Sequence, residues 1–129
     1  MVYLVDDDED DISLVREAFL THSYKGPVDT AENGMVLLAK LQAHQSDPDV
    51  IVMDLNMPIK NGFDTLKEIK ANPSLKDIPV IILTASTSKN DEVLWFDLGC
   101  SDYYSKPMSL KDYVPLVNMV KRIVSKSSL

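Results

Sequence analysis

The chain has 129 residues, which suits one globular domain of ordinary size and leaves too little length for two. Its formal net charge of −7 argues against non-specific nucleic-acid binding, because such binding depends on a basic surface. A single cysteine excludes an internal disulfide and a cysteine-built metal site, and no apolar run approaches the ~20 residues that span a bilayer. We therefore expect one cytoplasmic domain over residues 1–129, with no nucleic-acid partner and no membrane partner.

Short apolar runs predict the strands of a buried parallel sheet. Three of them, Val2–Val5, Val50–Met53 and Pro79–Leu83, lack the in–out alternation of a half-exposed strand. Val28–Ala31 and Asp102–Ser105 are weaker strand candidates, which we expect nearer the edges of the sheet.

Segments with helical spacing of apolar residues separate these strands. The clearest stripes are Ile12, Val15, Ala18 and Phe19; then Phe63, Leu66 and Ile69; then Leu116, Val117, Val120, Ile123 and Val124. Asn33-Gly34, Asn72-Pro73 and Gly99 serve as stop signals, and Pro115 indicates that the last helix begins near it or is kinked there. Five strand–helix repeats predict an α/β fold with a doubly wound parallel sheet and helices on both faces.

Polar residues stand where the predicted strands end. Asp6 and Asp7 follow the first strand, Asp54 follows the third, Thr84 follows the fourth and Lys106 follows the fifth. The carboxyl ends of parallel strands share one edge of the sheet, where ligands bind at the point of strand reversal. In the flavodoxin-like order 2-1-3-4-5, strands one and three flank this reversal, so the three aspartates are expected side by side.

Three clustered carboxylates require a compensating cation. Two full charges ~4 Å apart repel by roughly 4 kcal/mol at an effective dielectric constant near 20. The charge of a divalent metal ion would offset this repulsion, and oxygen-only ligands with room for water favour Mg²⁺. An aspartate beside Mg²⁺ can act as a nucleophile toward a phosphoryl donor, while Lys106 and the Thr84 hydroxyl stabilise the transferring oxygens.

Four strings of residues together resemble the receiver domains of two-component response regulators. They are Val5-Asp6-Asp7, Met53-Asp54-Leu55-Asn56-Met57-Pro58 with Gly62, Thr84-Ala85-Ser86, and Tyr103-Tyr104-Ser105-Lys106-Pro107. The resemblance extends from Tyr3 to about Val124. It implies a single-domain, chemotaxis-receiver-like response regulator with no output domain.

The resemblance also assigns the metal and phosphoryl ligands. Asp54 would be the phosphoacceptor, with a sensor histidine kinase or a phosphotransfer protein as the donor. Asp7, Asp54 and the Asn56 backbone carbonyl would hold Mg²⁺, while Asp6 would bind the metal through water or orient the site. Such a chain catalyses its own phosphorylation but is not an enzyme with a separate substrate.

The remaining implied roles concern the switch. Thr84 and Lys106 would contact the phosphoryl group, and Tyr103 would rotate as the aromatic switch when Thr84 moves. Pro107 would follow a cis peptide bond. A downstream protein would bind the face formed by the fourth helix, the fifth strand and the fifth helix.

Other acids of the run from Asp6 to Asp11 have a simpler interpretation. Glu9, Asp10 and Asp11 are taken as solvated residues of a helix N-terminus, where carboxylates suit the helix dipole. The role of Asp8 stays open.

Two other functions compete with the receiver. A haloacid-dehalogenase-type phosphatase also uses an aspartate at a strand end with Mg²⁺, and Asp6 and Asp8 imitate its first motif. However, Asp10 stands where that motif has Thr or Val, and the chain has no cap segment. An unphosphorylated pseudo-receiver that only binds a partner is disfavoured, because all five polar residues at the strand ends are present: Asp6, Asp7, Asp54, Thr84 and Lys106.

Trp95 lies between Leu94 and Phe96 in the predicted fourth helix. Three consecutive apolar residues span too wide an arc to face the core together, so at least one should lie near the surface. Trp95 is interpreted either as a residue that fills space against the sheet or as part of a partner-binding face.

Overall fold

The computed structural model describes the chain except for residues 44–47, 56, 58, 86–88, 108 and 128–129. The strands in the described part are β1 (Val2–Val5), β2 (Val28–Ala31), β3 (Val50–Met53), β4 (Val80–Thr84) and β5 (Asp102–Ser105). The helices are α1 (Glu9–Thr21), α2 (Gly34–Gln42), α3 (Gly62–Ala71), α4 (Lys89–Asp97) and α5 (Val114–Ser127), with a 3₁₀ turn η1 (Leu110–Tyr113).

The described strands form one parallel sheet in the order β2-β1-β3-β4-β5, which confirms the predicted topology. The two weakest strand candidates, β2 and β5, are the edge strands, as expected. The fourth strand begins one residue later than predicted, at Val80. Pro79 still contributes its carbonyl, which accepts the Ile51 N–H at 2.9 Å, but proline has no N–H to donate to a ladder.

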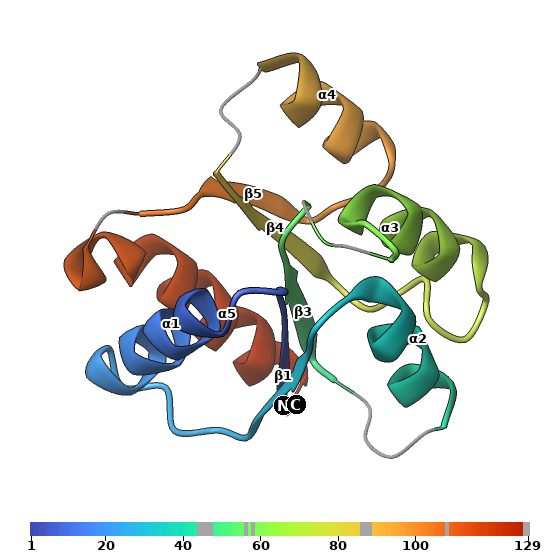
Figure 1. Cartoon of the computed structure of the whole chain (residues 1–129). Coiled ribbons are helices and arrows are strands. Elements are labelled where there is room, and N and C mark those ends of the chain that lie inside the picture. The colour runs from blue at the N-terminus through green and yellow to red at the C-terminus, as the bar shows by residue number, and fades with distance from the viewer. Residues whose placement is uncertain (44–47, 56, 58, 86–88, 108, 128–129) are drawn as a thin grey trace.

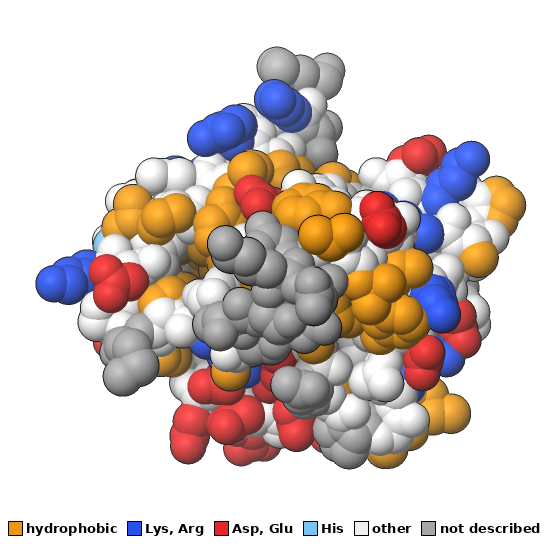
Figure 2. All heavy atoms as spheres, turned by 90° about the horizontal axis from the view of Figure 1, so that it is seen from above, with side chains coloured by type: hydrophobic (Ala, Val, Ile, Leu, Met, Phe, Trp, Pro, Cys, Tyr) orange, Lys and Arg blue, Asp and Glu red, His pale blue; other side chains and the backbone are white. Residues whose placement is uncertain are grey.

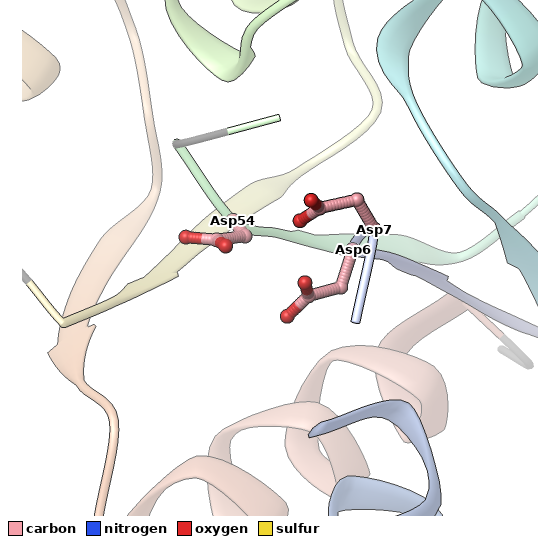
Figure 3. Close-up of side chains that lie close together, drawn as sticks. All are labelled: Asp6, Asp7 and Asp54. Carbon is pink, nitrogen blue, oxygen red and sulfur yellow. The ribbon is translucent and has the colours of Figure 1, made fainter. Parts of the chain in front are cut away.

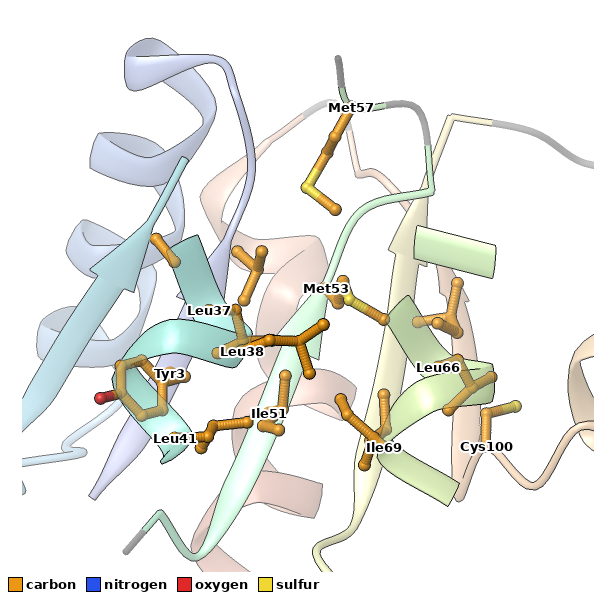
Figure 4. Close-up of a cluster of buried hydrophobic side chains, with 14 of the residues drawn as sticks. Tyr3, Leu37, Leu38, Leu41, Ile51, Met53, Met57, Leu66, Ile69 and Cys100 are labelled. Carbon is orange, nitrogen blue, oxygen red and sulfur yellow. The ribbon is translucent and has the colours of Figure 1, made fainter. Parts of the chain in front are cut away.

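Helices cover both faces of the sheet (Figure 1). Alternate residues of the central strands supply the two cores: Tyr3 and Val5 of β1 join the cluster under α2, α3 and α4, while Val2 and Leu4 join the cluster under α1 and α5. Figure 4 shows part of the first cluster, in which leucines of α2 and residues of α3 meet the face of β1 and β3. Both faces of β1, β3 and β4 are buried, which explains their continuous apolar sequences.

Polar side chains cap the N-termini of three helices, α1, α2 and α3; for α3 the cap is Asn61, which accepts the Asp64 N–H at 2.9 Å. Asp8 is the N-cap of α1, and its carboxylate accepts the backbone N–H groups of Asp10 and Asp11. Asn33 caps α2 by accepting the Val36 N–H at 2.9 Å. The prediction that Asn33-Gly34 stops an element is therefore only half correct, because the pair also starts the next helix.

Gly99 ends α4 as predicted. Its φ of +101° lies in the region that glycine adopts without a steric penalty. The N–H groups of Gly99 and Cys100 bond back to the carbonyls of Phe96 and Trp95 at 3.0 and 3.1 Å, which is the Schellman pattern of a helix end.

Pro115 is the second residue of α5, where the absence of its N–H costs the helix nothing. The helix continues directly from η1, so the prediction of a start near Pro115 is confirmed. None of the helices in the described ranges has both the length and the apolar character needed to cross a membrane.

Candidate metal centre at the carboxyl edge of the sheet

Three aspartates from two neighbouring strands meet at the carboxyl edge and form what we call the aspartate cluster, Asp6, Asp7 and Asp54. Each offers a carboxylate oxygen, and these oxygens lie within 4.8 Å of one another (Figure 3). The strand ladders place them: the Asp6 N–H bonds to the Ala31 carbonyl at 3.1 Å, and the Asp54 N–H bonds to the Val5 carbonyl at 2.9 Å. The predicted juxtaposition of the three side chains is therefore observed.

Lys106 brings a positive charge into this cluster from the end of β5. Its Nζ donates to Asp6 Oδ2 at 2.9 Å, to Asp54 Oδ2 at 3.1 Å and to Asp11 Oδ2 at 2.7 Å. The backbone N–H of Lys106 bonds to the Thr84 carbonyl at 2.7 Å, which fixes the lysine at the end of the β4–β5 ladder. One ammonium is thus shared among three carboxylates.

Burial and charge shift the protonation of the site. Burial raises the pKa of Asp6 to about 6, although the Asp8 N–H and the Lys106 ammonium stabilise its charged form. Burial alone would lower the pKa of Lys106, but its hydrogen bonds to Asp11 and Asp6 and the charge of Asp54 outweigh burial and raise it. Lys106 therefore stays charged at neutral pH and cannot act as a base there.

The donor set of the cluster fits a hard divalent cation. Asp6 and Asp54 are buried and Asp7 is exposed, so an ion held there keeps one side open to water. Within the described residues, no hydrogen bond or ion pair occupies the Asp7 carboxylate, whereas the other two are partly engaged by Lys106. Three carboxylates, no sulfur or nitrogen ligand and an open side are the features that Mg²⁺ prefers.

Thr84 and Tyr103 occupy the strand positions that the sequence predicts. Thr84 is the last residue of β4 and is fully buried. Tyr103 lies on β5, half-buried against the apolar cluster under α2, α3 and α4. Asn56, the fourth predicted metal ligand, lies outside the described residues. The expected cis peptide bond at Pro107 is wrong for this structure, in which none of the described peptide bonds is cis.

Asp11 is the residue of the site that the sequence did not reveal. Its position in the first turn of α1 is explained equally well by the helix dipole, so the charge alone gave no reason to place it in the site. The open question about Asp8 is answered by its role as N-cap. The acidic run therefore contains two residues of the aspartate cluster, the N-cap Asp8, and Asp11, whose carboxylate accepts a hydrogen bond from Lys106. Figure 2 shows acidic side chains gathered in one region of the face that it presents.

Comparison with known proteins shows which family the chain resembles. The family model described as the response regulator receiver domain matches residues 2–118. The response regulator Rcp1 of Synechocystis is 33% identical over 126 residues, covering 94% of this chain and 86% of Rcp1. The response regulator SaeR of Staphylococcus aureus is 36% identical, but this chain spans only 47% of its length.

Solved structures of response regulators are similar to the whole described fold. The phosphorylated cyanobacterial phytochrome response regulator RcpA superposes with a TM-score of 0.80 at 37% identity, covering 95% of this chain and 89% of RcpA. A Mn²⁺-bound form of Rcp1 has a TM-score of 0.80 at 36% identity, covering 96% of this chain and 91% of that one.

The chain belongs to the response regulator receiver domain family. Receivers of this type accept a phosphoryl group in a Mg²⁺-dependent reaction and signal, and the two competing functions are not favoured. They are signalling modules rather than enzymes with a separate substrate, and they interact with histidine kinases or other phosphodonors.

Proposed function

We propose that Asp54 is the residue that accepts the phosphoryl group, from a sensor histidine kinase or a phosphotransfer protein. The observation that carries this proposal is the position of Asp54: it is buried at the end of β3 within the aspartate cluster, and the Lys106 ammonium lies 3.1 Å from its Oδ2. Asp54 follows the middle strand of the sheet, and its Oδ1 also accepts the Leu55 N–H at 2.7 Å.

The proposed reaction transfers the phosphoryl group from a histidine nitrogen to a carboxylate oxygen. An Asp54 oxygen forms the new O–P bond as the N–P bond of the donor breaks, and the bonding pair leaves with the imidazole nitrogen, which then takes a proton. Lys106 stays charged and pairs with a phosphoryl oxygen. Mg²⁺, when bound, neutralises part of the charge on the transferring oxygens.

Four residues are proposed as the metal site. Asp7 and Asp54 would bind the ion directly together with the backbone carbonyl of Asn56, and Asp6 would act through water. The carboxylate of Asp7 supports its role as a direct ligand, because it is exposed and has no hydrogen-bond or ion-pair partner among the described residues.

We propose that Thr84 and Tyr103 carry the signal away from Asp54. Thr84 would bond to the phosphoryl group, and Tyr103 on the neighbouring strand would change its position in response. The register supports this step, because Thr84 pairs with Ser105, two residues from Tyr103. The readout surface would be the face of α4, β5 and α5, where a downstream protein would bind.

We also propose that residues 1–129 act as a single-domain regulator in the cytoplasm. The coverage of Rcp1, at 86% of that protein, supports this organisation, whereas SaeR represents the alternative of a receiver within a longer regulator.

The proposal is tested by intact-mass measurement after incubation with acetyl phosphate and Mg²⁺. We expect the addition of one phosphoryl group, prevented by a metal chelator and by Asp54→Ala. Asp77→Ala serves as the matched control, because Asp77 is exposed and lies before the opposite end of β4. An undiminished yield in Asp54→Ala would refute the assignment of the acceptor.

A further inference from the structure

The Lys106 ammonium has three N–H donors, and each has a different carboxylate partner. Two of these partners, Asp6 and Asp54, belong to the aspartate cluster. The third, Asp11, does not, and its hydrogen bond of 2.7 Å is the shortest of the three. Lys106 is therefore held from two directions, by the cluster and by helix α1.

The position of Asp11 on α1 makes this contact a specific one. Asp8 is the N-cap, so Asp11 is the third residue of the helix, the place from which a longer Glu or Gln turns back to cap the N-terminus. The Asp11 side chain instead reaches a lysine 95 positions away at the end of β5. Its neighbour Asp10 is exposed and has no contact with Lys106 among the described residues.

The contact bears on metal binding because the lysine and an incoming cation compete. Lys106 occupies Asp6 Oδ2 and Asp54 Oδ2, and both carboxylates belong to the proposed metal site. A third carboxylate outside the cluster shares the charge of the ammonium and draws it toward α1. Without that carboxylate, Lys106 would pair with the two cluster aspartates alone and would be harder to displace from them.

We propose that Asp11 is a positioning residue, which holds Lys106 on the α1 side of the site so that the cluster carboxylates remain available to the metal and to the phosphoryl donor. This inference rests on the proposed function of the Asp54 site. It assigns to Asp11 no contact with either the metal or the phosphoryl group. Its effect passes through Lys106, so it must disappear when the lysine is absent.

A double-mutant cycle isolates that coupling. The affinity for Mg²⁺ is measured by amide NMR titration for the wild-type chain, Asp11→Asn, Lys106→Met and the double variant. We expect Asp11→Asn to weaken Mg²⁺ binding about fivefold in the presence of Lys106 and by less than about twofold in its absence. A loss of general negative charge would weaken binding equally in both backgrounds.

Asp10→Asn is the matched control. It removes the same charge from the same turn of α1 and thus has the same effect on the helix dipole, but it leaves Lys106 untouched. We expect it to change the affinity for Mg²⁺ by less than about twofold. Thermal unfolding of each variant verifies that the fold is retained.

A second measurement serves if the double variant does not fold. At saturating Mg²⁺, the rate of phosphorylation by acetyl phosphate should fall several-fold in Asp11→Asn relative to Asp10→Asn, because Lys106 is then no longer held on the α1 side, away from the nucleophilic carboxylate. Equal affinities and equal rates for these two variants would overturn the inference, as would an Asp11→Asn effect that persists without Lys106. If the wild-type chain binds no Mg²⁺, the proposed metal site itself fails.

Discussion

Lys106 at the carboxyl edge makes three charged hydrogen bonds, whereas Leu94 and Phe96 on α4 expose 40% and 45% of their surface. The two regions are also joined to the sheet differently. Backbone ladders place Asp6 and Asp54, but α4 is connected to β5 through the turn at Gly99 and rests on the core through Trp95. The site is fixed by strand ladders and by charge, while Trp95 is the one buried residue among the side chains of α4 that the structure describes, those of residues 93–97.

This contrast indicates how a phosphoryl group could be read out. Charge pairing makes the site sensitive to a change of charge. Because Trp95 is the buried residue in the described part of α4, a shift of this helix requires little free energy. Trp95 packs edge-on against Phe63 of α3 with 5.4 Å between ring centroids, and its indole N–H has no hydrogen-bond partner in the part of the chain that the structure describes. A helix anchored in this way can be repacked without breaking a polar contact of that tryptophan.

The largest expected effect distinguishes Asp7, the proposed metal ligand, from its neighbour Asp8, the N-cap of α1. Asp7→Ala should weaken Mg²⁺ binding by at least about tenfold, because it removes a direct ligand. Asp8→Ala should alter Mg²⁺ binding little and should instead cost about 1 kcal/mol of stability, since Asp8 caps α1. Metal titration and thermal unfolding of both variants measure the two effects. Equal losses of metal affinity would show that the cap and the ligand have been assigned wrongly.

The next prediction tests the attachment of α4. Trp95→Ala should lower the free energy of unfolding by about 3 kcal/mol, because it empties a buried site beside Phe63. Phe96→Ala should cost less than about 1 kcal/mol, since nearly half of that side chain is exposed. Denaturant unfolding compares them. Similar costs would mean that α4 is held along its whole length and not chiefly by Trp95.

Lys106→Ala should separate metal binding from signalling. Mg²⁺ should still bind, because removal of a competing cation leaves the three cluster carboxylates in place. Beryllofluoride, a mimic of the phosphoryl group, should no longer shift the amide NMR signals of α4, because the cation that pairs with it is missing. Abolished Mg²⁺ binding would contradict this separation of roles.

The smallest expected signal comes from Trp95 itself. Addition of beryllofluoride and Mg²⁺ should alter its fluorescence through a change in its packing, and Asp54→Ala should remove the response. Trp95 is the only tryptophan of the chain, so the signal has a single source. A constant fluorescence while NMR shows the mimic bound would mean that α4 does not transmit the switch.

The fold and most of the site follow from local sequence features. Residues at the ends of parallel strands must meet at one edge, so Asp6, Asp7 and Asp54 are predictable once the strands are recognised. The role of Asp11 is not predictable, because a carboxylate in the first turn of a helix is favourable with or without a lysine partner.

The same limit applies to α4. Leu94, Trp95 and Phe96 are consecutive, so periodicity shows that some of them must be exposed but does not identify which. The structure answers this through tertiary packing: Trp95 is buried against Phe63, and its two neighbours face outward. The burial of Trp95 supports the first of its two interpretations, that it fills space against the sheet.

The central claim, that Asp54 receives the phosphoryl group, is tested most directly by locating the modified residue. Borohydride reduces an aspartyl phosphate to homoserine, which marks its position for peptide mass spectrometry. The receiver assignment predicts homoserine at residue 54 after treatment with acetyl phosphate and Mg²⁺. Homoserine at residue 6, the nucleophile expected of a haloacid-dehalogenase-type phosphatase, would contradict it.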